Sequence, residues 1–552
     1  MTTKHSGALA LTWTNKHLRL LAHDDATYEW VDPSDFRVSE VRLLHSVAPV
    51  GDVHSDRARA KDNLLIRGDS LHALTSLLRI PEFAAEYEGK VKLVYIDPPF
   101  NTGQAFTHYD DGLEHSVWLT MLRDRLLQIK RLLRPDGSVW VHLDDVEVHR
   151  ARVVLDEVFG IDNFVATVIW EKTDSPRMDA KLFSTRHDYI HVYRKSQDFV
   201  VNRLAATKSN ATKIDKDGRP YYLNPLRARG GQGSTRAARP NLYFGIADPD
   251  GNDVLPKLPD GTDGAWRWGK EKVEAEADRI EWTKGTGGWN PNYRIYEDGV
   301  RTRPPETIWS FTDVGSTRNS AKEIKDLLKG KVFATPKPER LMERILHIGS
   351  NPGDIVLDCF AGSGTTAAVA HKMGRRWAAV EWSAENITNF DIPRLTKVVK
   401  GDDPGGVTAS AGWEGGGGFR LLDVAPSVYE VDDATVLLAE NVTAGDLAES
   451  VAAQLGFAYE PEGAFCGKKN AMRLAVIDGV LSDDIVRLLV GALGEKERVT
   501  VVATAAEPGA EDVLRSLRPG SRVRKVPRDL ARLSRRRSEV VQLVLDGLEV
   551  VE

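Results

Sequence analysis

One segment constrains the fold of this chain more than any other: an apolar run that ends in a glycine-rich turn and continues as a helix. The run at 355–357 is followed by the turn DCFAGSG at 358–364, and helical spacing of apolar residues covers 365–373. Another short apolar run lies at 377–380. Strand, glycine turn, helix and strand in this order are typical of a doubly wound sheet. We therefore predict an α/β fold with a Rossmann-like sheet.

Other parts of the chain predict more of the same sheet. The apolar run at 91–96 (VKLVYI) ends at a double proline, which prevents further ladder pairing. Apolar residues recur at helical spacing over 117–133, and a Pro-Asp-Gly turn then leads into a strand-like run at 138–143. Residues 190–193 form a further strand-like run.

Length and composition exclude several classes of protein. The chain has 552 residues, three to four typical domain lengths, so we expect more than one domain. No stretch approaches the roughly 20 apolar residues of a membrane helix, and the N-terminus lacks the pattern of a signal peptide. Its two cysteines, Cys359 and Cys466, cannot build a disulfide framework or a cysteine zinc site. We expect a cytoplasmic protein without a metal centre.

Charge is distributed unevenly along the chain. There are 74 Lys and Arg against 80 Asp and Glu, and a net charge of -6 excludes a globally basic coat for nucleic acid. Residues 201–240 nevertheless hold nine basic residues against two acidic ones, a local charge of +7. This run suits phosphate contacts, and the alternative is a solvated loop. A nearby tryptophan-rich segment is more typical of a small hydrophobic core than of base-stacking platforms; its members are Trp266, Trp268, Trp282, Trp289 and Trp309.

The glycine turn is the first candidate binding site. Its pattern, Asp358-x-Phe360-x-Gly362-x-Gly364, lets the backbone approach a ligand at a helix N-terminus, but it is neither a dinucleotide fingerprint nor a P-loop. Glu381 follows the next strand, where a carboxylate can accept both hydroxyls of a ribose. A carboxylate that can bind a ribose, next to a turn that lacks a pyrophosphate-binding pattern, favours S-adenosylmethionine as the cofactor. The alternative is a tight turn in a generic α/β fold.

The second candidate site is the sequence Asp97-Pro98-Pro99-Phe100 at the end of a strand, where α/β sheets carry their sites. The two prolines fix the Asp97 carboxylate and the Pro98 carbonyl as a pair of hydrogen-bond acceptors, which fits the two donors of a planar exocyclic amine. Phe100 offers an aromatic face to a base that has left its stack. A strand-terminating turn without function is the alternative.

Together the two motifs resemble a known family. DPPF followed by NTG, with DCFAGSG about 260 positions downstream, resembles the β-class of amino-group DNA methyltransferases. The resemblance covers roughly residues 60–400 and includes NLLIRGDSLHALTSLL at 63–78 and FATPKPERL at 333–341. It implies that Asp69 contacts the cofactor adenine and that Lys337, in the later motif, helps to hold the methionine end. The segment at 412–420 resembles modification (Mod) subunits of type III restriction-modification systems.

The resemblance implies a function and a set of partners. Asp at the first position of DPPF favours the N6 amine of adenine, because cytosine-N4 enzymes of the family usually carry Ser there. We expect methyl transfer to double-stranded DNA by base flipping, in a restriction-modification or phage-defence system. The chain would then form a homodimer or bind a partner restriction or defence subunit. The alternatives are a cytosine-N4 enzyme, a DNA-reading scaffold of a defence complex and an RNA methyltransferase.

We expect six parts along the chain. A target-recognition insertion at 201–320 would carry the DNA contacts, and Arg227, Arg229, Arg236 and Arg239 are its candidate phosphate ligands. The basic stretch at 522–537 is open between a DNA contact and a partner-facing helix. The other parts are an N-terminal extension (1–60), the catalytic and cofactor-binding halves of the methyltransferase domain (61–200 and 321–400), a glycine-rich linker (401–420) and a C-terminal α/β domain (421–552), in which strands are predicted at 473–481, 499–505 and 540–545.

Overall fold

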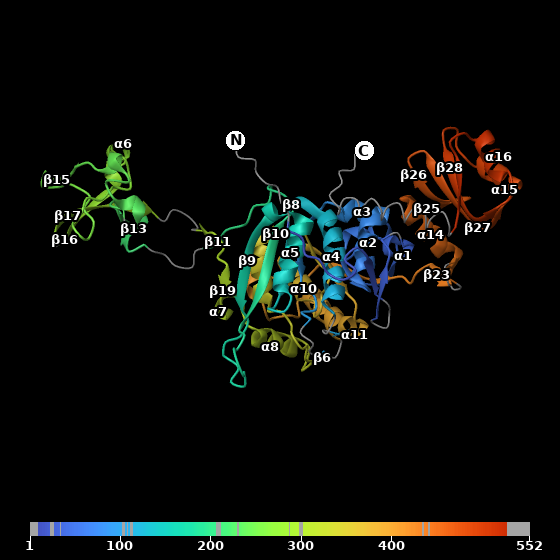
Figure 1. Ribbon diagram of the computed structural model, residues 1–552, viewed down its shortest axis with the longest axis horizontal. Helices are drawn as coiled ribbons and strands as arrows, with labels where there is room; N and C mark the ends of the chain where they lie inside the picture. The colour runs from blue at the N-terminus through green and yellow to red at the C-terminus, as the bar shows by residue number, and fades with distance from the viewer. Residues whose placement is uncertain are drawn as a thin grey trace. The chain divides into compact units, whose positions relative to one another are not determined.

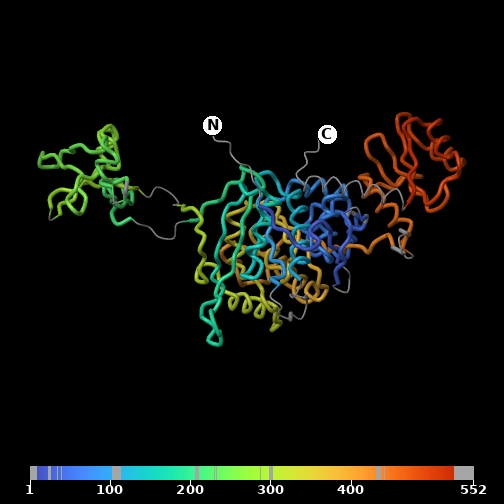
Figure 2. Tube along the Cα trace, viewed as in Figure 1, coloured from blue at the N-terminus to red at the C-terminus, as the bar shows by residue number. Residues whose placement is uncertain are grey.

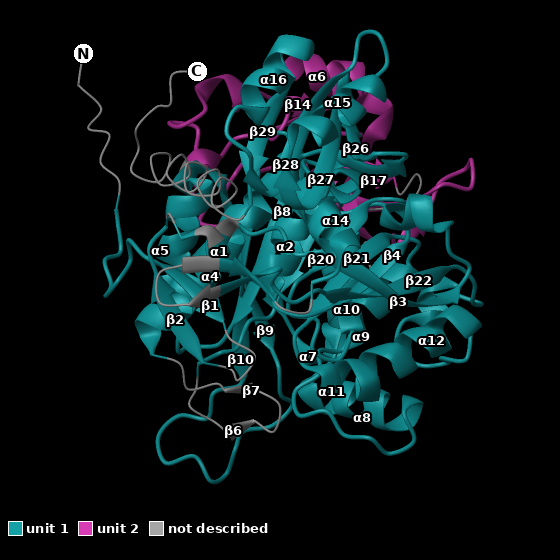
Figure 3. Ribbon diagram, turned by 90° about the vertical axis from the view of Figure 1, so that its right-hand side faces the viewer, with its two compact units in different colours: residues 1–202, 306–552 teal, residues 203–305 magenta. Residues whose placement is uncertain are grey.

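The computed structural model describes most of the chain and divides it into two compact units. Unit 1 comprises residues 1–202 and 306–552, and unit 2 comprises residues 203–305 (Figure 3). The structure describes residues 9–22, 27–33, 35–101, 105–106, 109–110, 114–205, 211–228, 231–285, 287–296, 302–432, 435–439 and 442–526.

A ten-stranded sheet forms the centre of unit 1, in the order β19-β9-β10-β8-β5-β20-β21-β4-β22-β3 (Figure 1). The six strands from β8 to β22 are parallel to one another, which confirms the predicted α/β sheet. The strands are β3 (Leu44–Gly51), β4 (Asn63–Arg67), β5 (Val91–Ile96), β8 (Leu133–Leu143), β9 (Phe164–Glu171), β10 (His187–Arg194), β19 (Ile308–Trp309), β20 (Ile355–Asp358), β21 (Arg376–Glu381) and β22 (Gly418–Val424).

Helices pack on both faces of this sheet. Val94 of β5 belongs to the core that the helices α2, α4 and α5 share, whereas a Cβ on Gly349 of α9 would meet the neighbouring residue Leu93 at 2.5 Å. Successive residues of a strand point to opposite faces, so α9 lies on the other side, where α10 and α12 continue the layer. The helices are α2 (Ser70–Arg79), α3 (Pro81–Tyr87), α4 (His115–Leu132), α5 (Val148–Phe159), α9 (Glu339–Gly349), α10 (Thr365–Lys372) and α12 (Ile392–Lys400).

Burial on both faces explains why β5 is apolar over nearly its whole length. All six of its residues are buried, including Lys92. The stem of Lys92 crosses the core, and its Nζ donates to Asp136 Oδ2 at 2.8 Å, so the charge is paired where it emerges. A continuous apolar run is the pattern of a central parallel strand.

Residues 44–51, within the expected N-terminal extension, belong to the central sheet as strand β3. β3 pairs antiparallel with β22 over seven residue pairs and forms one edge of the central sheet. Ahead of it, β1 (Arg19–Ala22) and β2 (Tyr28–Val31) form a hairpin whose Arg19 donates to Asp124 of α4 at 2.9 Å. The expected boundary at residue 60 is therefore wrong.

The expected glycine-rich linker at 401–420 is also wrong, because this segment is packed. Gly416 N donates to Val399 O at 2.7 Å, and Trp413 Nε1 donates to Val398 O at 2.8 Å. The segment then enters β22, which pairs parallel with β4 in the central sheet. Its glycines permit close backbone approach: a Cβ on Gly401 would lie 2.4 Å from Glu414 O. The predicted domain boundary at 421 falls inside a strand.

One buried carboxylate joins this segment to the helices. Glu339 accepts hydrogen bonds from Lys372 Nζ at 2.8 Å, Arg394 Nη2 at 2.8 Å and the backbone N–H of Val407 at 3.0 Å. Burial alone would raise the pKa of Glu339, but Arg394 and Lys372 together hold it below its usual value. Three elements distant in sequence thus depend on one ionised side chain.

The C-terminal part of unit 1 carries a five-stranded sheet in the order β25-β26-β27-β28-β29. β27 and β28 confirm the strands predicted at 473–481 and 499–505, whereas the strand predicted at 540–545 and most of the basic stretch at 522–537 lie outside the described residues. The elements are α14 (Ala444–Leu455), β25 (Ala458–Glu462), β26 (Phe465–Lys469), β27 (Met472–Leu481), α15 (Asp483–Gly491), β28 (Arg498–Ala506), α16 (Ala510–Leu517) and β29 (Arg522–Lys525).

Unit 2 has a small core of its own beside a four-stranded sheet, β12-β13-β17-β16. Trp266 and Trp268 are buried there with Leu226 and Val273, so these two tryptophans are core residues. Trp309, by contrast, lies in β19 of the central sheet. The strands are β12 (Lys213–Ile214), β13 (Pro220–Pro225), β16 (Ile280–Gly285) and β17 (Gly288–Tyr296). The compact unit ends at residue 305, before the predicted limit at 320.

The packing of the 401–420 segment can be tested at two glycines of positive φ. Gly406 has φ +56°, and an added Cβ would lie 1.9 Å from Glu339 Oε2, while Gly412 has φ +61° and nothing within 4 Å. We expect Gly412→Ala to cost only the backbone strain, roughly 1–2 kcal/mol. Gly406→Ala should cost about 1–3 kcal/mol more, because it displaces a buried ion-pair partner. Urea unfolding measures both, and equal losses would contradict the packed arrangement.

Candidate functional site

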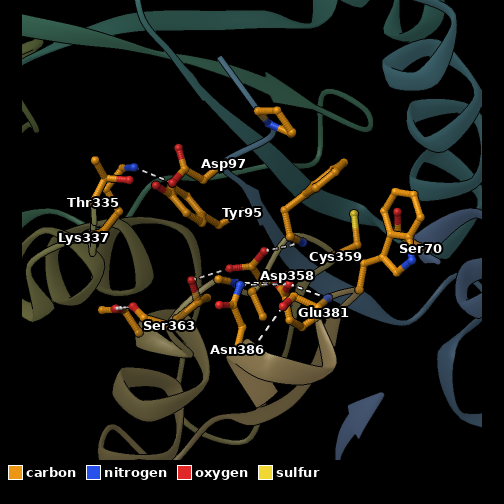
Figure 4. Close-up of a pocket in the computed structure, with 18 of the residues that line it drawn as sticks. Ser70, Tyr95, Asp97, Thr335, Lys337, Asp358, Cys359, Ser363, Glu381 and Asn386 are labelled. Atoms are coloured by element: carbon orange, nitrogen blue, oxygen red, sulfur yellow. Dashed lines mark hydrogen bonds and ion pairs between the residues drawn. The ribbon is translucent and has the colours of Figure 1, made fainter. Parts of the chain in front are cut away.

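A cavity of about 330 Å³ opens at the carboxyl ends of β4, β5, β20 and β21 (Figure 4). The chain runs from β5 through α4 to β8, which neighbours β5 on one side of the β5–β20 pair. It runs from β20 through α10 to β21, which neighbours β20 on the other side of the pair. The crossovers on either side of the β5–β20 pair therefore run in opposite directions. Such a switch point leaves a crevice outside the strand ends, where open α/β sheets bind their ligands.

The glycine turn closes one side of the cavity. Gly362 and Gly364 have φ of +59° and +70°, and Gly364 is the N-cap residue of α10. Glu381, at the end of β21, holds the turn: its Oε2 accepts the backbone N–H of Gly362 at 2.8 Å, and its Oε1 accepts that of Ser383 at 2.9 Å. Glu381 thus shapes the turn as well as lining the cavity.

Gly364 and Gly362 differ in what surrounds them. Gly362 lines the cavity, but Gly364 does not. A Cβ on Gly364 would meet Asp391 Oδ1 at 2.7 Å, whereas one on Gly362 would meet the Phe333 ring at 3.6 Å. The positive φ and Asp391 behind the turn explain why glycine stands at position 364, and its role as a cofactor contact stays a prediction.

Asp358, the last residue of β20, lies at the floor of the cavity. Its carboxylate accepts hydrogen bonds from Thr366 Oγ1 at 2.6 Å and from the backbone N–H of Phe360 at 3.0 Å. Burial raises the pKa of Asp358 to about 7, and the nearby carboxylates of Asp97 and Glu381 add to the shift. The floor therefore favours a ligand that brings positive charge.

Asp69, the N-cap residue of α2, also lines the cavity. It caps the helix by accepting the backbone N–H of Leu71 at 2.8 Å, and Arg125 Nη2 donates to its other oxygen at 2.6 Å. Burial would raise the pKa of Asp69, but Arg125 and the helix N–H groups hold it below its usual value. The Arg125 guanidinium also lies 6.0 Å from the centre of the Phe360 ring, which lines the same cavity.

Asp97 and Lys337 meet at the mouth of the cavity, although they are 240 residues apart in the sequence (Figure 4). Lys337 Nζ donates to Asp97 Oδ2, and Asp97 Oδ1 is buried with no hydrogen-bond partner among the described residues. The Lys337 ammonium also lies 5.1 Å from the centre of the Phe100 ring. The structure therefore brings Lys337 to the DPPF motif, a contact that the expected role at the methionine end does not include.

A buried hydrogen-bond network supports the DPPF turn from behind. The His142 ring stacks on Phe100 with centroids 5.9 Å apart, and it is held between Tyr95 Oη at 2.8 Å and Asp188 Oδ2 at 3.3 Å. Burial lowers the pKa of His142, and Lys337 lowers it further. Trp118 Nε1 donates to Pro99 O at 2.6 Å.

A second anchor holds the residue after the motif. Asn101 has φ +62°, and its Nδ2 donates to the buried carboxylate of Glu147 at 2.7 Å. His115 Nδ1 forms a second hydrogen bond with the same Glu147 oxygen. The sequence did not predict that Glu147, His142 and Trp118 support the DPPF turn. These contacts form only in the fold, and no sequence motif indicates them.

The cavity fits a nucleoside-type cofactor with a cationic centre. Its volume lies at the lower end of the range of small-molecule sites. Besides Asp97 Oδ1, the lining residue Asn386 has a buried Oδ1 that accepts no hydrogen bond from any described residue. Arg125 and Lys337 are already paired with Asp69 and Asp97. The buried Asp358 carboxylate accepts its hydrogen bonds from neutral donors, the Thr366 hydroxyl and the Phe360 N–H. A positively charged ligand would therefore balance the negative charge of Asp358.

The predicted DNA-contacting arginines lie in unit 2, where acidic residues pair with part of the basic run. Arg236 Nη1 donates to Asp263 Oδ2 at 3.1 Å, and Arg227 Nη1 donates to Lys257 O. Arg239 is exposed, and Arg229 lies outside the described residues. Residues 203–305 contain 18 Lys and Arg against 14 Asp and Glu, so the unit keeps a net charge of +4.

In the described ranges, no three His, Cys, Asp or Glu side chains gather in a way that could hold a metal ion. None of the helices in those ranges has the length and apolar character needed to cross a membrane.

Comparisons with known proteins agree on one family. A profile described as DNA methylase matches residues 91–390, more than half of the chain. The chain is 30% identical over 440 residues to a probable type III restriction-modification enzyme HindVI Mod subunit of Haemophilus influenzae, covering 68% of this chain and 56% of that protein. It is 31% identical over 395 residues to the type III restriction-modification enzyme EcoPI Mod subunit of Escherichia phage P1, covering 60% of each. The chain thus spans less than two thirds of the length of these relatives.

A shorter relative and two solved structures are also similar. The type II methyltransferase M1.MboII of Moraxella bovis is 39% identical over 321 residues, 57% of this chain and 94% of that one. A putative DNA modification methylase from Thermus thermophilus, complexed with S-adenosyl-L-methionine, has 18% identity and a TM-score of 0.31 over 66% of this chain and 100% of that one. The cytosine-N4-specific PvuII DNA methyltransferase has 16% identity and a TM-score of 0.34 over 62% and 90%.

The raised pKa of Asp358 predicts a pH-dependent stability. Its pKa is about 7 in the fold and near 4 in the unfolded chain, so the folded state binds more protons between these values. The free energy of unfolding therefore falls as pH rises from 4 to 7. Asp358→Asn removes this fall, and we expect its stability relative to wild type to be roughly 2–3 kcal/mol more favourable at pH 8 than at pH 5.

Asp136→Asn provides the control for this measurement. The pKa of Asp136 is held at about 2 by its hydrogen bond with Arg134, below both pH values. Its substitution should therefore change stability equally at pH 5 and pH 8. The same pH-independent result for Asp358→Asn would contradict the raised pKa.

Proposed function

This chain belongs to the DNA methylase family, and we propose that it transfers a methyl group from S-adenosylmethionine to the N6 amine of adenine in double-stranded DNA. The observation that carries the proposal is the unpartnered Oδ1 of Asp97 at the mouth of the cavity, beside the Phe100 ring. An acceptor buried without a partner costs free energy unless a ligand donates to it.

The cavity residues would hold the cofactor. They are Asp69, Asp358, Phe360, Gly362 and Glu381, all of which line the cavity. Carboxylates at these positions suit ribose hydroxyls and the positive charges of the ligand. When bound, S-adenosylmethionine supplies an electrophilic methyl group. Lys337, by contrast, is proposed to act on Asp97, because its ammonium contacts that carboxylate.

The DPPF residues would hold the base that receives the methyl group. Asp97 Oδ1 accepts one N–H of the exocyclic amine, the Pro98 carbonyl accepts the other, and Phe100 stacks on the extruded base. Two acceptors on one amine increase the electron density of its nitrogen. The proton that this nitrogen must release lies on the hydrogen bond to Asp97. Lys337 pairs with Oδ2 of the carboxylate and leaves Oδ1 for the substrate.

The choice of adenine over cytosine follows from the carboxylate at position 97. A carboxylate is a stronger acceptor than the hydroxyl usual in the cytosine-N4 enzymes of this class. The names of the two Mod subunits support an enzyme of restriction-modification that acts as the modification subunit of a larger assembly, and M1.MboII supports a methyltransferase. We propose that this chain forms a homodimer or binds a restriction subunit.

The direct test is to identify the modified base. Unmethylated genomic DNA is incubated with the protein and S-adenosylmethionine carrying a labelled methyl group, then digested to nucleosides and separated. Label in N6-methyl-2′-deoxyadenosine supports the proposal. Label in N4-methyl-2′-deoxycytidine would instead establish the cytosine alternative, and no label in any nucleoside would favour a DNA-reading scaffold. Sequencing with modified-base detection then gives the recognition site.

Asp97→Ala should abolish methyl transfer while leaving cofactor affinity within a few-fold of wild type. Loss of a charge-assisted acceptor in the transition state costs on the order of 3 kcal/mol, about a hundredfold in turnover. Calorimetry with S-adenosylmethionine separates binding from turnover. Asp145→Ala removes an exposed carboxylate just beyond β8 and should leave both nearly unchanged. More than a tenth of wild-type turnover in Asp97→Ala would show that Asp97 does not hold the amine.

The basic run of unit 2 should supply phosphate contacts. Replacing Arg227, Arg229, Arg236 and Arg239 together by Gln should weaken DNA binding and flatten its salt dependence by up to ~0.9 log unit per lost contact. Cofactor affinity should not change, because the described residues that line the cavity all belong to unit 1. A control variant with the same change in net charge replaces four exposed basic residues of the C-terminal sheet domain: Lys468, Lys469, Arg487 and Arg515. Equal salt slopes in the two variants would exclude a specific role for the four arginines.

A further inference from the structure

The loop between β9 and β10, residues 172–186, projects from the same edge of the sheet as Asp97. β8 runs parallel to β5, so its end at Leu143 lies at the edge where β5 leads into Asp97. β10 is antiparallel to β8, and Tyr189 pairs with Leu143, so β10 begins at that edge. β9 is antiparallel to β10 and ends there. Figure 1 and Figure 2 show the loop reaching beyond the strand ends.

This loop exposes apolar side chains to a degree found nowhere else in the described ranges. Phe183, Met178 and Leu182 are 95%, 93% and 92% exposed, the three highest values among large apolar residues there. Single exposed apolar residues are ordinary, but three on one short loop are typical of a surface that contacts a partner. None of the three contributes to a core cluster of unit 1 that the described residues form.

The loop is anchored at its base and connected to the site. Asp174 forms an ion pair with Arg318 at 2.8 Å, and Ser184 Oγ accepts the backbone N–H of Arg177 at 2.7 Å. Lys172 Nζ donates to Asp188 at 2.6 Å, and Asp188 is a partner of His142, which stacks on Phe100. A rigid base therefore presents the apolar tip at a position fixed relative to the DPPF turn.

Two cations accompany the apolar tip. Arg177 and Lys181 form no ion pair with any described residue, whereas Arg186 at the base is paired with Glu171 at 2.6 Å. Apolar side chains flanked by such cations match a nucleic acid duplex, in which stacked bases lie between phosphates. A protein partner would not require these two cations.

We propose that this loop inserts Leu182 and Phe183 into the base stack of the DNA duplex, filling the gap that the extruded target base leaves, while Arg177 and Lys181 contact the flanking phosphates. The inference rests on the proposed function, since it requires a target base outside the helix. Extrusion costs the stacking and pairing of that base, and an apolar wedge in the vacated space lowers this cost. The free-energy cost of extrusion is smaller for a mispaired base, so the loss of a wedge should matter less there. A general structural effect of the substitution would instead reduce methylation of paired and mispaired duplexes equally.

The test compares two duplexes, both containing the recognition site found by sequencing. One is fully paired, and in the other the target base is mispaired. With Leu182→Ala and Phe183→Ala combined, we expect methylation of the paired duplex to fall about tenfold or more and that of the mispaired duplex to fall much less. The control is Ile161→Ala: Ile161 is 65% exposed and precedes β9 at the opposite edge of the sheet. This variant should methylate both duplexes at the wild-type rate.

Each other outcome overturns the proposal in a distinguishable way. An equal loss on both duplexes would show that the loop does not act on base extrusion, and unchanged rates would show that it does not act on DNA. A change in oligomeric state, measured by light scattering, would assign the loop to an interface between copies of this chain. Wild-type protein that methylates neither duplex would overturn the proposed function itself, and the inference with it.

Discussion

The parallel pairing of β5 with β20 is the contact on which the site depends. Val94 pairs with Leu357, so residues more than 250 positions apart in the sequence lie side by side, and the ends of the two strands bring Asp97 next to Asp358. The connections from β5 to β8 and from β20 to β21 run in opposite directions. Neither of their crossover helices, α4 and α10, therefore covers these strand ends. A chain that carries its DPPF motif far ahead of its glycine turn can therefore still build one cavity from both.

Charge inside this unit is balanced by contacts between distant segments. Asp69 is neutralised by Arg125, Asp97 by Lys337 and Glu339 by Lys372 and Arg394. Removing one partner of a buried pair leaves an uncompensated charge, which costs several kcal/mol, so each pair also fixes the position of the elements that carry it. Asp358 has no such cation among the described residues, and its pKa rises to about 7. The imbalance occurs where the cofactor is proposed to bind.

The sequence predicted the central sheet and most of the cavity because their signals are local. A double proline after an apolar run and a glycine turn before a helix are visible without any partner. Contacts between distant segments have no such signal. The Lys337–Asp97 ion pair and the anchor on Asn101 depend on side chains that meet only in the fold. The segment at 401–420 was misjudged for a related reason: glycines that permit close packing have the same composition as glycines that give a flexible linker.

Under the proposed function, the Asp97–Lys337 pair also limits which bases the site can accept. With Oδ2 occupied by the ammonium, Asp97 has one oxygen left as an acceptor, and a ligand must bring an N–H donor to satisfy it. A carbonyl oxygen at that position would leave Oδ1 unpaired and face a carboxylate, which is unfavourable. Adenine and cytosine both carry an exocyclic amine, whereas thymine carries a carbonyl oxygen where cytosine has its amine. The ion pair thus disfavours thymine before any contact with the rest of the base is considered, and the strength of the carboxylate as an acceptor is what favours adenine over cytosine.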